Sequence, residues 1–219
     1  MARNARDRAV SDADLPAWSV ARIREFATGL EVTPRTQREL FELGVSRLID
    51  FKLWLEKGND SLAATYQKVE TETEMRNVVA NWLNTRATNR YTCAQQAELA
   101  NAQRPDICLQ NPTVAAPVPI ELKLLDMNWT GPKLCERLRN QLAGDYLRDQ
   151  HAGCAIMLLV WQGGSGTRQW EIDGKRVGIA DLAAAMTDYW QKIATESPHV
   201  EAIEIVVVDL TLRALKSDC

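Results

Sequence analysis

Three ionisable residues stand close together in two short apolar segments in the middle of the chain. Asp106 follows Pro105 at the start of the first segment, and the second segment reads Ile120-Glu121-Leu122-Lys123. Because side chains alternate between the two faces of a strand, Glu121 and Lys123 are expected on the same face. If the two segments pair, two carboxylates and one ammonium meet in a small patch. This combination suits a hydrolase that uses a divalent metal ion.

The chemistry expected of this patch is phosphodiester hydrolysis. That reaction needs a nucleophilic water and stabilisation of a transition state that carries additional negative charge. Carboxylate oxygens bind Mg²⁺ well, and Mn²⁺ is expected to substitute for it. The sequence therefore predicts Asp106 and Glu121 as metal ligands, with the backbone carbonyl of Leu122 as a further ligand. Lys123 would stabilise the developing charge or position the attacking water.

A Glu-x-Lys pair has a simpler explanation on an exposed strand, where it serves solubility and cross-strand ion pairing. Residues 119–125 are apolar except at Glu121 and Lys123, which predicts a central strand instead. Burying both charges there is costly unless they pair or bind a metal ion. A structural buried ion pair remains the alternative to a metal site.

Helical and strand-like patterns alternate around these residues. Helices are predicted over residues 17–30, 36–57, 61–68, 71–87, 131–150 and 179–194. Strands are predicted over residues 90–99, 106–109, 118–125, 155–161 and 203–208, and the proline-rich insert 111–119 is predicted to be a hairpin loop. This order predicts an α/β fold with a mixed central sheet flanked by helices.

The predicted elements also suggest how the chain is divided. We expect an N-terminal helical extension over residues 1–69 and a core domain over residues 70–219. Within the core, the helix over 131–150 is expected to connect two parallel strands as a right-handed crossover.

The order of these features resembles the PD-(D/E)XK nucleases. In that family a helix with a glutamate precedes a strand with Pro-Asp, a strand with Glu-x-Lys, a helix and a fourth strand. Pro105-Asp106 and Glu121-x-Lys123 match the two half-motifs, and the resemblance covers roughly residues 70–162. It implies a restriction-endonuclease-like core and a Mg²⁺-dependent endonuclease that cleaves DNA, with RNA less expected.

The resemblance implies further site residues on the two helices. The helix glutamate is either Glu72 or Glu74, and both have an ordinary alternative as acids in the first turn of a helix. Some family members carry a glutamine and a tyrosine after the lysine strand, which suggests Gln141 near the scissile phosphate. The matching tyrosine would be Tyr146, but the gap between the two is one residue longer than in the family, so they need not share a face.

Two features beside the predicted site bear on substrate binding. Trp129 lies on a loop after the lysine strand, where it would stack on a base or simply pack at the rim of the core. Four basic residues crowd the next segment, namely Lys133, Arg137, Arg139 and Arg148. Because acidic residues share that segment, an ordinary solvated helix face is the alternative to a nucleic-acid surface.

A second function class stays open from the sequence. The fold could serve as a catalytically silent binding or assembly module, in which the N-terminal helices dock a partner or form a homo-oligomer. The resemblance extends more loosely to nuclease domains that act as effectors of bacterial defence systems. In that case the N-terminal helices would couple the nuclease to a larger complex.

The composition excludes several other classes. The chain has 219 residues, of which 46% are hydrophobic and 25% charged, and its net charge is −3. Its longest apolar runs are strand-sized, and its charged first residues lack the apolar segment of a secretory signal. Five scattered cysteines are typical of reduced thiols, and two histidines argue against a zinc site. We therefore expect a cytoplasmic protein with no membrane contact.

Overall fold

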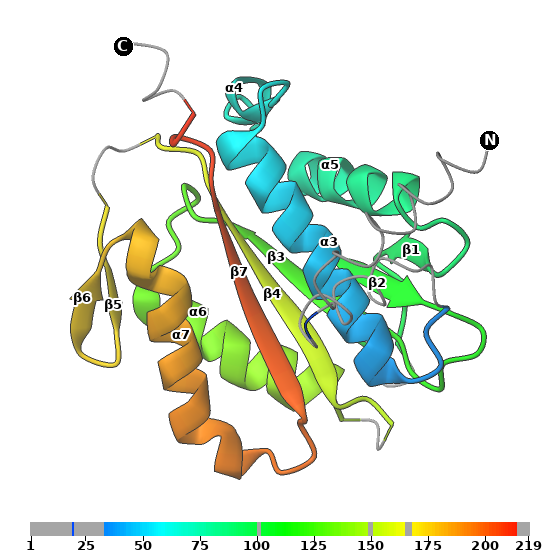
Figure 1. Cartoon of the computed structure of the whole chain (residues 1–219). Helices are drawn as coiled ribbons and strands as arrows, with labels where there is room; N and C mark the ends of the chain where they lie inside the picture. Colours follow the sequence, from blue (N-terminus) through cyan, green and yellow to red (C-terminus); the bar gives the residue numbers. More distant parts are fainter. Residues whose placement is uncertain (1–18, 20–32, 100–101, 149–150, 165–167, 214–219) are drawn as a thin grey trace, which may run out of the picture. The chain divides into compact units, whose positions relative to one another are not determined.

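A computed structural model describes residue 19 and residues 33–99, 102–148, 151–164 and 168–213. Its helices are α3 (Gln37–Lys57), α4 (Ala63–Tyr66), α5 (Glu72–Thr85), α6 (Gly131–Glu136), the π-helix η1 (Arg137–Tyr146), α7 (Ile179–Ile193) and the short 3₁₀-helix η2 (Ala194–Glu196). Its strands are β1 (Thr92–Gln95), β2 (Ile107–Gln110), β3 (Val118–Leu124), β4 (Cys154–Trp161), β5 (Trp170–Ile172), β6 (Lys175–Val177) and β7 (Ala202–Asp209) (Figure 1). The helix predicted over residues 17–30 lies outside the described residues apart from residue 19.

Five strands form one mixed sheet in the order β1-β2-β3-β4-β7. β1, β2 and β3 pair antiparallel, whereas β3, β4 and β7 pair parallel. The connection between the parallel strands β3 and β4 runs through α6 and η1, because parallel strands cannot be joined by a tight turn. The mixed α/β fold predicted from the sequence is confirmed, and all five predicted strands are present.

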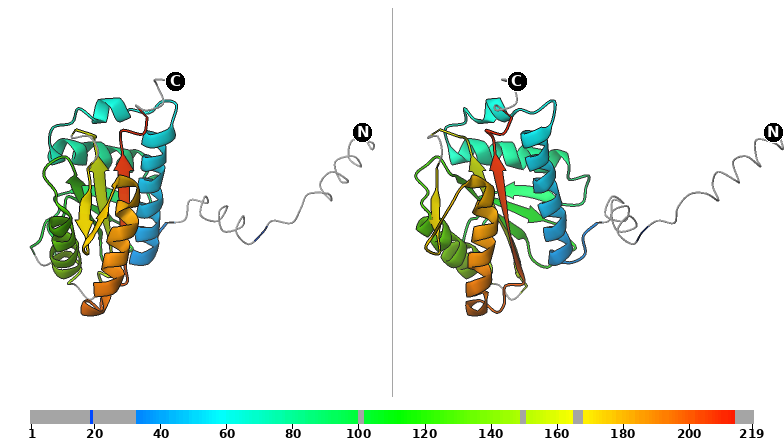
Figure 2. Two further views of the ribbon diagram at one scale, coloured as in Figure 1. Left: turned by 90° about the vertical axis from the view of Figure 1, so that its left-hand side faces the viewer. Right: turned by 60° about the vertical axis from the view of Figure 1, so that its left-hand side comes forward.

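Helices cover both faces of this sheet and create two apolar cores (Figure 2). On one face α3 and α5 pack against Ile156 and Leu158 of β4, together with alternate residues of β2 and β3. On the other face α6, η1 and α7 pack against Met157 and Leu159 of the same strand. β4 is buried along its whole length, as expected for a parallel strand in the middle of three layers.

α3 belongs to the folded core. Its N-cap Thr36 accepts the backbone N–H of Glu39, and its apolar side buries Leu48 and Phe51 against the sheet. The compact unit that contains the sheet begins at Thr33. The predicted boundary between residues 69 and 70 therefore falls inside this unit, and the apolar side of α3 is occupied by the sheet.

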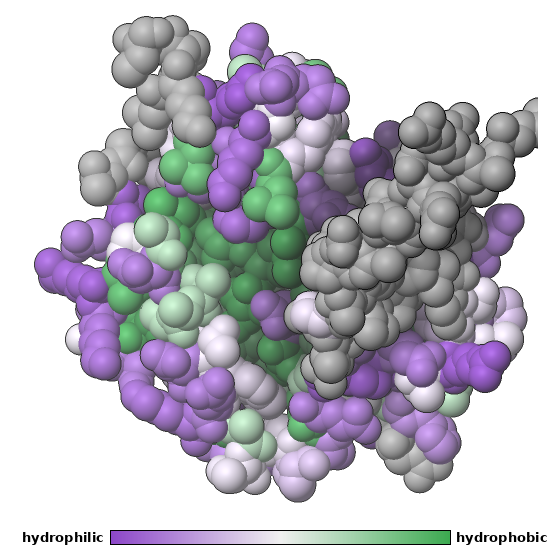
Figure 3. Space-filling view, in the orientation of Figure 1, coloured by the Kyte–Doolittle hydropathy of each residue, from purple (hydrophilic) through white to green (hydrophobic). Residues whose placement is uncertain are grey.

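β7 forms one edge of the sheet and lies between α3 and α7 (Figure 1). Apolar surface gathers over this face of the molecule (Figure 3). α3 satisfies part of the open edge, because Lys52 Nζ donates to the carbonyl of Val207 at 2.7 Å and Glu56 accepts the N–H of Asp209 at 2.9 Å. Charged side chains at an edge strand hinder its pairing with another chain.

One pair of strands was not predicted from the sequence. β5 and β6 form an antiparallel hairpin whose turn, Asp173-Gly174, has positive φ at both residues. An Asp-Gly turn between two short apolar or β-prone runs is a strong hairpin signal, and it was present in the sequence. In the described part of the chain, no helix is long and apolar enough to cross a membrane.

Candidate functional site

The site lies where β3 continues past the end of β2. The two strands pair only as far as Ile107 and Ile120, so the N–H groups of Leu122 and Leu124 have no partner on a neighbouring strand at that edge. Two carboxylates accept these N–H groups in place of the missing strand. Asp106 Oδ2 accepts the N–H of Leu122 at 3.0 Å, and Glu72 Oε1 accepts the N–H of Leu124 at 3.4 Å. Because no strand pairs with β3 on this side past Ile120, its free N–H groups hold two acids from different elements at the edge of the strand.

The ammonium of Lys123 lies among three carboxylates. Its Nζ is 2.8 Å from Glu121 Oε1, 3.4 Å from Glu72 Oε2 and 3.5 Å from Asp106 Oδ2. The side chains of Lys123 and Glu121 are only 7% and 3% exposed. As predicted from strand alternation, both lie on the face of β3 opposite to Ile120, Leu122 and Leu124, which pack in the core with α3 and α5. The predicted convergence of Asp106, Glu121 and Lys123 is therefore present.

Burial and the neighbouring charges act against each other in this cluster. Burial raises the pKa of Glu121, and the nearby ammonium of Lys123 offsets that rise only in part. Burial alone would lower the pKa of Lys123, but the charges of Glu121, Asp106 and Glu72 outweigh it, so this pKa is raised. Lys123 therefore carries a positive charge at neutral pH. The cluster holds a cation in a partly desolvated place, where its field is stronger than in water.

The structure separates the two candidate helix glutamates. Glu72 reaches Lys123 and also accepts the indole N–H of Trp129 at 3.0 Å. Glu74 turns away and forms a capping box at the start of α5, where it accepts the backbone N–H of Thr71 at 3.1 Å. Of the two alternatives, Glu72 belongs to the cluster and Glu74 does not.

An arginine that the sequence analysis did not single out also reaches the cluster. Arg76 is one helical turn after Glu72 on α5, and its Nη1 lies 3.3 Å from Asp106 Oδ1. Its Nε donates to Gln95 Oε1 at 3.3 Å. The side chain is buried, and it contacts Oδ1 of Asp106, whereas Lys123 contacts Oδ2. Its spacing of four residues from Glu72 was the signal that could have indicated it.

The predicted helix over 131–150 is in fact two kinds of helix. α6 continues without interruption into the π-helix η1, whose wider turns give hydrogen bonds from residue i to i+5. Gln141 and Tyr146 are five residues apart, and η1 therefore brings them to one face, where Gln141 Nε2 donates to Tyr146 Oη. Tyr146 Oη in turn donates to Glu121 Oε2 at 3.0 Å. Gln141 reaches the cluster only through Tyr146.

The residues fit a hard divalent cation in the kind of donor they offer. Three carboxylates share this edge, and the carbonyl of Leu122 points to the same side as its N–H, toward Asp106. Within the described ranges, however, no three His, Cys, Asp or Glu side chains are placed to hold one metal ion together. The position between the carboxylates is taken by the Lys123 ammonium.

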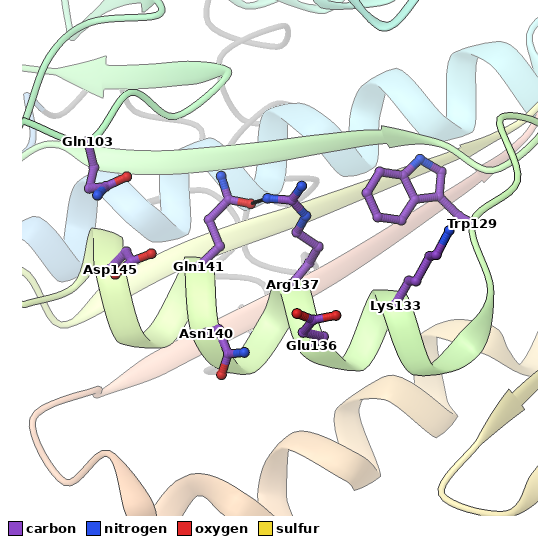
Figure 4. Close-up of a pocket in the computed structure, with 8 residues that line it drawn as sticks. All are labelled: Gln103, Trp129, Lys133, Glu136, Arg137, Asn140, Gln141 and Asp145. Carbon is purple, nitrogen blue, oxygen red and sulfur yellow. Dashed lines mark hydrogen bonds between the residues drawn. The ribbon is translucent and has the colours of Figure 1, made fainter.

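A cleft of about 520 Å³ opens beside the cluster (Figure 4). Its wall is formed by Trp129 and by side chains of α6 and η1, together with Gln103. Two of the four basic residues noted in the sequence, Lys133 and Arg137, line this cleft. Of the other two, Arg139 pairs away from the cleft with Glu196 at 2.7 Å, and Arg148 pairs at 3.7 Å with Asp145, which lines the cleft.

Comparison with protein-family models, curated proteins and solved structures found no match to this chain. The interpretation of the site therefore depends on its own geometry.

Proposed function

We propose that this protein is a metal-dependent nuclease of the PD-(D/E)XK type that hydrolyses phosphodiester bonds in DNA. The observation that carries the proposal is the buried ammonium of Lys123, which lies within 3.5 Å of carboxylates from three separate elements. A purely structural ion pair needs one partner for the lysine. Three partners at the open edge of a strand, beside a cleft, are instead typical of a site that receives charge.

The proposed roles follow from position. Asp106, Glu121 and the carbonyl of Leu122 would hold Mg²⁺ or Mn²⁺, which supplies Lewis acidity when bound. Lys123 stabilises the negative charge that develops on the phosphate in the transition state. Glu72 holds Lys123 in place, and Tyr146 orients the carboxylate of Glu121, supported by Gln141.

The experiment that tests the proposal incubates the wild-type protein with circular DNA, linear DNA and RNA, in Mg²⁺ or in EDTA. We expect cleavage of DNA in Mg²⁺ and none in EDTA. Cleavage of the circular substrate would assign an endonuclease. The proposal is contradicted if no nucleic acid is cleaved in Mg²⁺ or Mn²⁺ by folded protein.

A catalytically silent module with the same fold is the second candidate. It is favoured by one observation, namely that the described part of the chain contains no ready group of three metal-ligating side chains. Isothermal titration of Mn²⁺ into the protein separates the two. The nuclease binds the ion at the acidic cluster, so that Asp106→Asn removes the binding heat, whereas the silent module gives no such heat.

A further inference from the structure

The cleft beside the cluster presents a fixed aromatic ring. Trp129 is held at both ends, because its indole N–H donates to Glu72 and its carbonyl accepts from Arg168 Nη2 at 2.8 Å and Trp170 Nε1 at 3.0 Å. Its side chain is half-buried and lines the cleft. A ring that is already ordered loses little conformational entropy when a flat ligand stacks on it.

Polar side chains share the cleft with this ring. The amides of Gln103, Asn140 and Gln141 line the cleft. That of Gln141 is bonded to Arg137 and Tyr146, whereas that of Asn140 offers both a donor and an acceptor to the edge of a base. Arg137 extends beside Trp129, with its Cζ 5.7 Å from the ring centroid, and donates to Gln141 (Figure 4). Among the described residues, Lys133 and Asn140 have no side-chain hydrogen bond or ion pair, so both are available to a ligand.

The charge of the cleft indicates how many backbone phosphates it can contact. Two cations, Lys133 and Arg137, and two acids, Glu136 and Asp145, line the cleft, Asp145 being paired with Arg148, and the whole chain carries a net charge of −3. A protein that follows a duplex backbone gains its affinity from many phosphate contacts and needs a broad basic surface. This cleft instead offers one aromatic ring, the amide of Asn140 and the two cations Lys133 and Arg137.

We propose that the cleft binds an unpaired nucleobase, which stacks on Trp129 while Arg137 and Lys133 contact the adjacent phosphate. The preferred substrate is then single-stranded DNA or DNA with an unpaired segment next to the cleaved bond. In a duplex both faces of each base are covered by its neighbours, so stacking on a protein ring requires a base that is already free or is extruded. As a statement about substrate, this inference rests on the proposed nuclease function.

The test measures binding without cleavage. Fluorescence anisotropy in EDTA compares a labelled single-stranded oligonucleotide with a blunt duplex of the same sequence, using wild-type protein, Trp129→Ala, Trp129→Phe and Lys175→Ala. Lys175 is exposed on the β5–β6 hairpin, away from the cleft, and serves as the control. We expect the wild type to prefer the single strand, and Trp129→Ala to weaken that binding about 5- to 150-fold, the range for loss of one stacked base. Trp129→Phe should retain it within a few-fold, and Lys175→Ala should leave it unchanged.

A second measurement does not depend on whether Trp129→Ala folds. Single abasic sites are placed in turn along the single strand, which removes one base and keeps every phosphate. One position should weaken binding to wild-type protein as much as Trp129→Ala does, and the same abasic site should have no further effect on that variant. If binding of an RNA of the same sequence is weakened equally by Trp129→Ala, this also supports the nucleobase as the ligand. It would further show that the protein does not distinguish the two sugars.

The inference is overturned if wild-type protein binds the duplex as tightly as the single strand, or if no abasic position weakens binding. These failures differ from a failure of the nuclease proposal. Metal-dependent cleavage without any effect of Trp129 or of abasic sites would overturn the inference alone. Single-strand binding that depends on Trp129, without cleavage in any metal, would overturn the nuclease and leave a binding module for unpaired nucleobases.

Discussion

At the level of single residues, Lys123 and its carboxylates are charged groups buried at a cost in free energy. Taking these charges out of water is unfavourable, and the raised pKa of Glu121 records that burial outweighs pairing for this group. Arg76 and Lys123 together face three acids, so the cluster retains an excess of negative charge. A cluster with more acids than cations is suited to receive a further cation, and this is why we propose a metal-dependent function.

The two helix glutamates give a prediction at this scale. Glu72→Ala removes a contact of Lys123 and of Trp129, and we expect DNA cleavage to fall about 100-fold, as when one positioned polar group of an active site is removed. Glu74→Ala removes the capping box and should lower the free energy of unfolding by about 1 kcal/mol while cleavage stays near wild type.

Cleavage rates under saturating Mg²⁺ and urea unfolding curves measure both effects. The assignment of Glu72 is wrong if Glu74→Ala impairs cleavage more than Glu72→Ala does in folded protein.

The sequence predicted part of this cluster, for identifiable reasons. Strand alternation was sufficient to place Glu121 and Lys123 together, and the Pro-Asp segment brought Asp106 beside them. Helical projection of the sequence could not distinguish Glu72 from Glu74, because both lie in the first turn. The pattern Thr71-x-x-Glu74 is a capping-box signature and would have assigned Glu74 to the helix end.

At the level of elements, the strands of the five-stranded sheet were predictable, whereas the kind of helix at the site was not. Apolar runs defined β2, β3, β4 and β7, which are largely buried, whereas β1 is short and has no buried residue. η1 was expected to be an ordinary α-helix, yet its leucines recur at intervals of four and five, as in Leu138, Leu142 and Leu147, which is wider than 3.6 residues per turn. That wider spacing is the signal for the π-helix that joins Gln141 to Tyr146.

At the scale of elements, we predict that the domain needs α3 in order to fold. α3 buries Leu40, Leu48, Phe51 and Leu55, each less than 2% exposed. Burial of each such side chain contributes about 1.5–3 kcal/mol, so their sum is of the order of a whole domain's stability of about 5–15 kcal/mol. A fragment over residues 70–219 should therefore fail to fold, whereas a fragment over residues 33–219 should fold.

Circular dichroism with thermal melting distinguishes the fragments. A cooperative melt of the 70–219 fragment, with the helix content of its own segments, would show that α3 is an appended element after all.

For the whole molecule, the layered α/β arrangement explains where the chemistry lies. Helices occupy both faces of the sheet, so a polar site must lie at an edge or an end of a strand. Among the five strands, β3 is central yet extends beyond its neighbour β2, and that step leaves room for Asp106, Glu72 and the cleft. The division at residues 69 and 70 could not be corrected from sequence, because an amphipathic helix such as α3 looks the same whether it packs on its own sheet or on a partner.

The most direct measurement of the central proposal is the rate of Mg²⁺-dependent DNA cleavage by Asp106→Asn and Lys123→Met, with Lys175→Ala as the control. Both substitutions keep much of the side-chain shape, and Asp106→Asn keeps an oxygen that can accept the N–H of Leu122. We predict that each lowers the rate at least about 100-fold, as expected for groups that stabilise the transition state, while circular dichroism shows folded protein. Cleavage at the wild-type rate by both folded variants would contradict the assignment of this cluster as the active site.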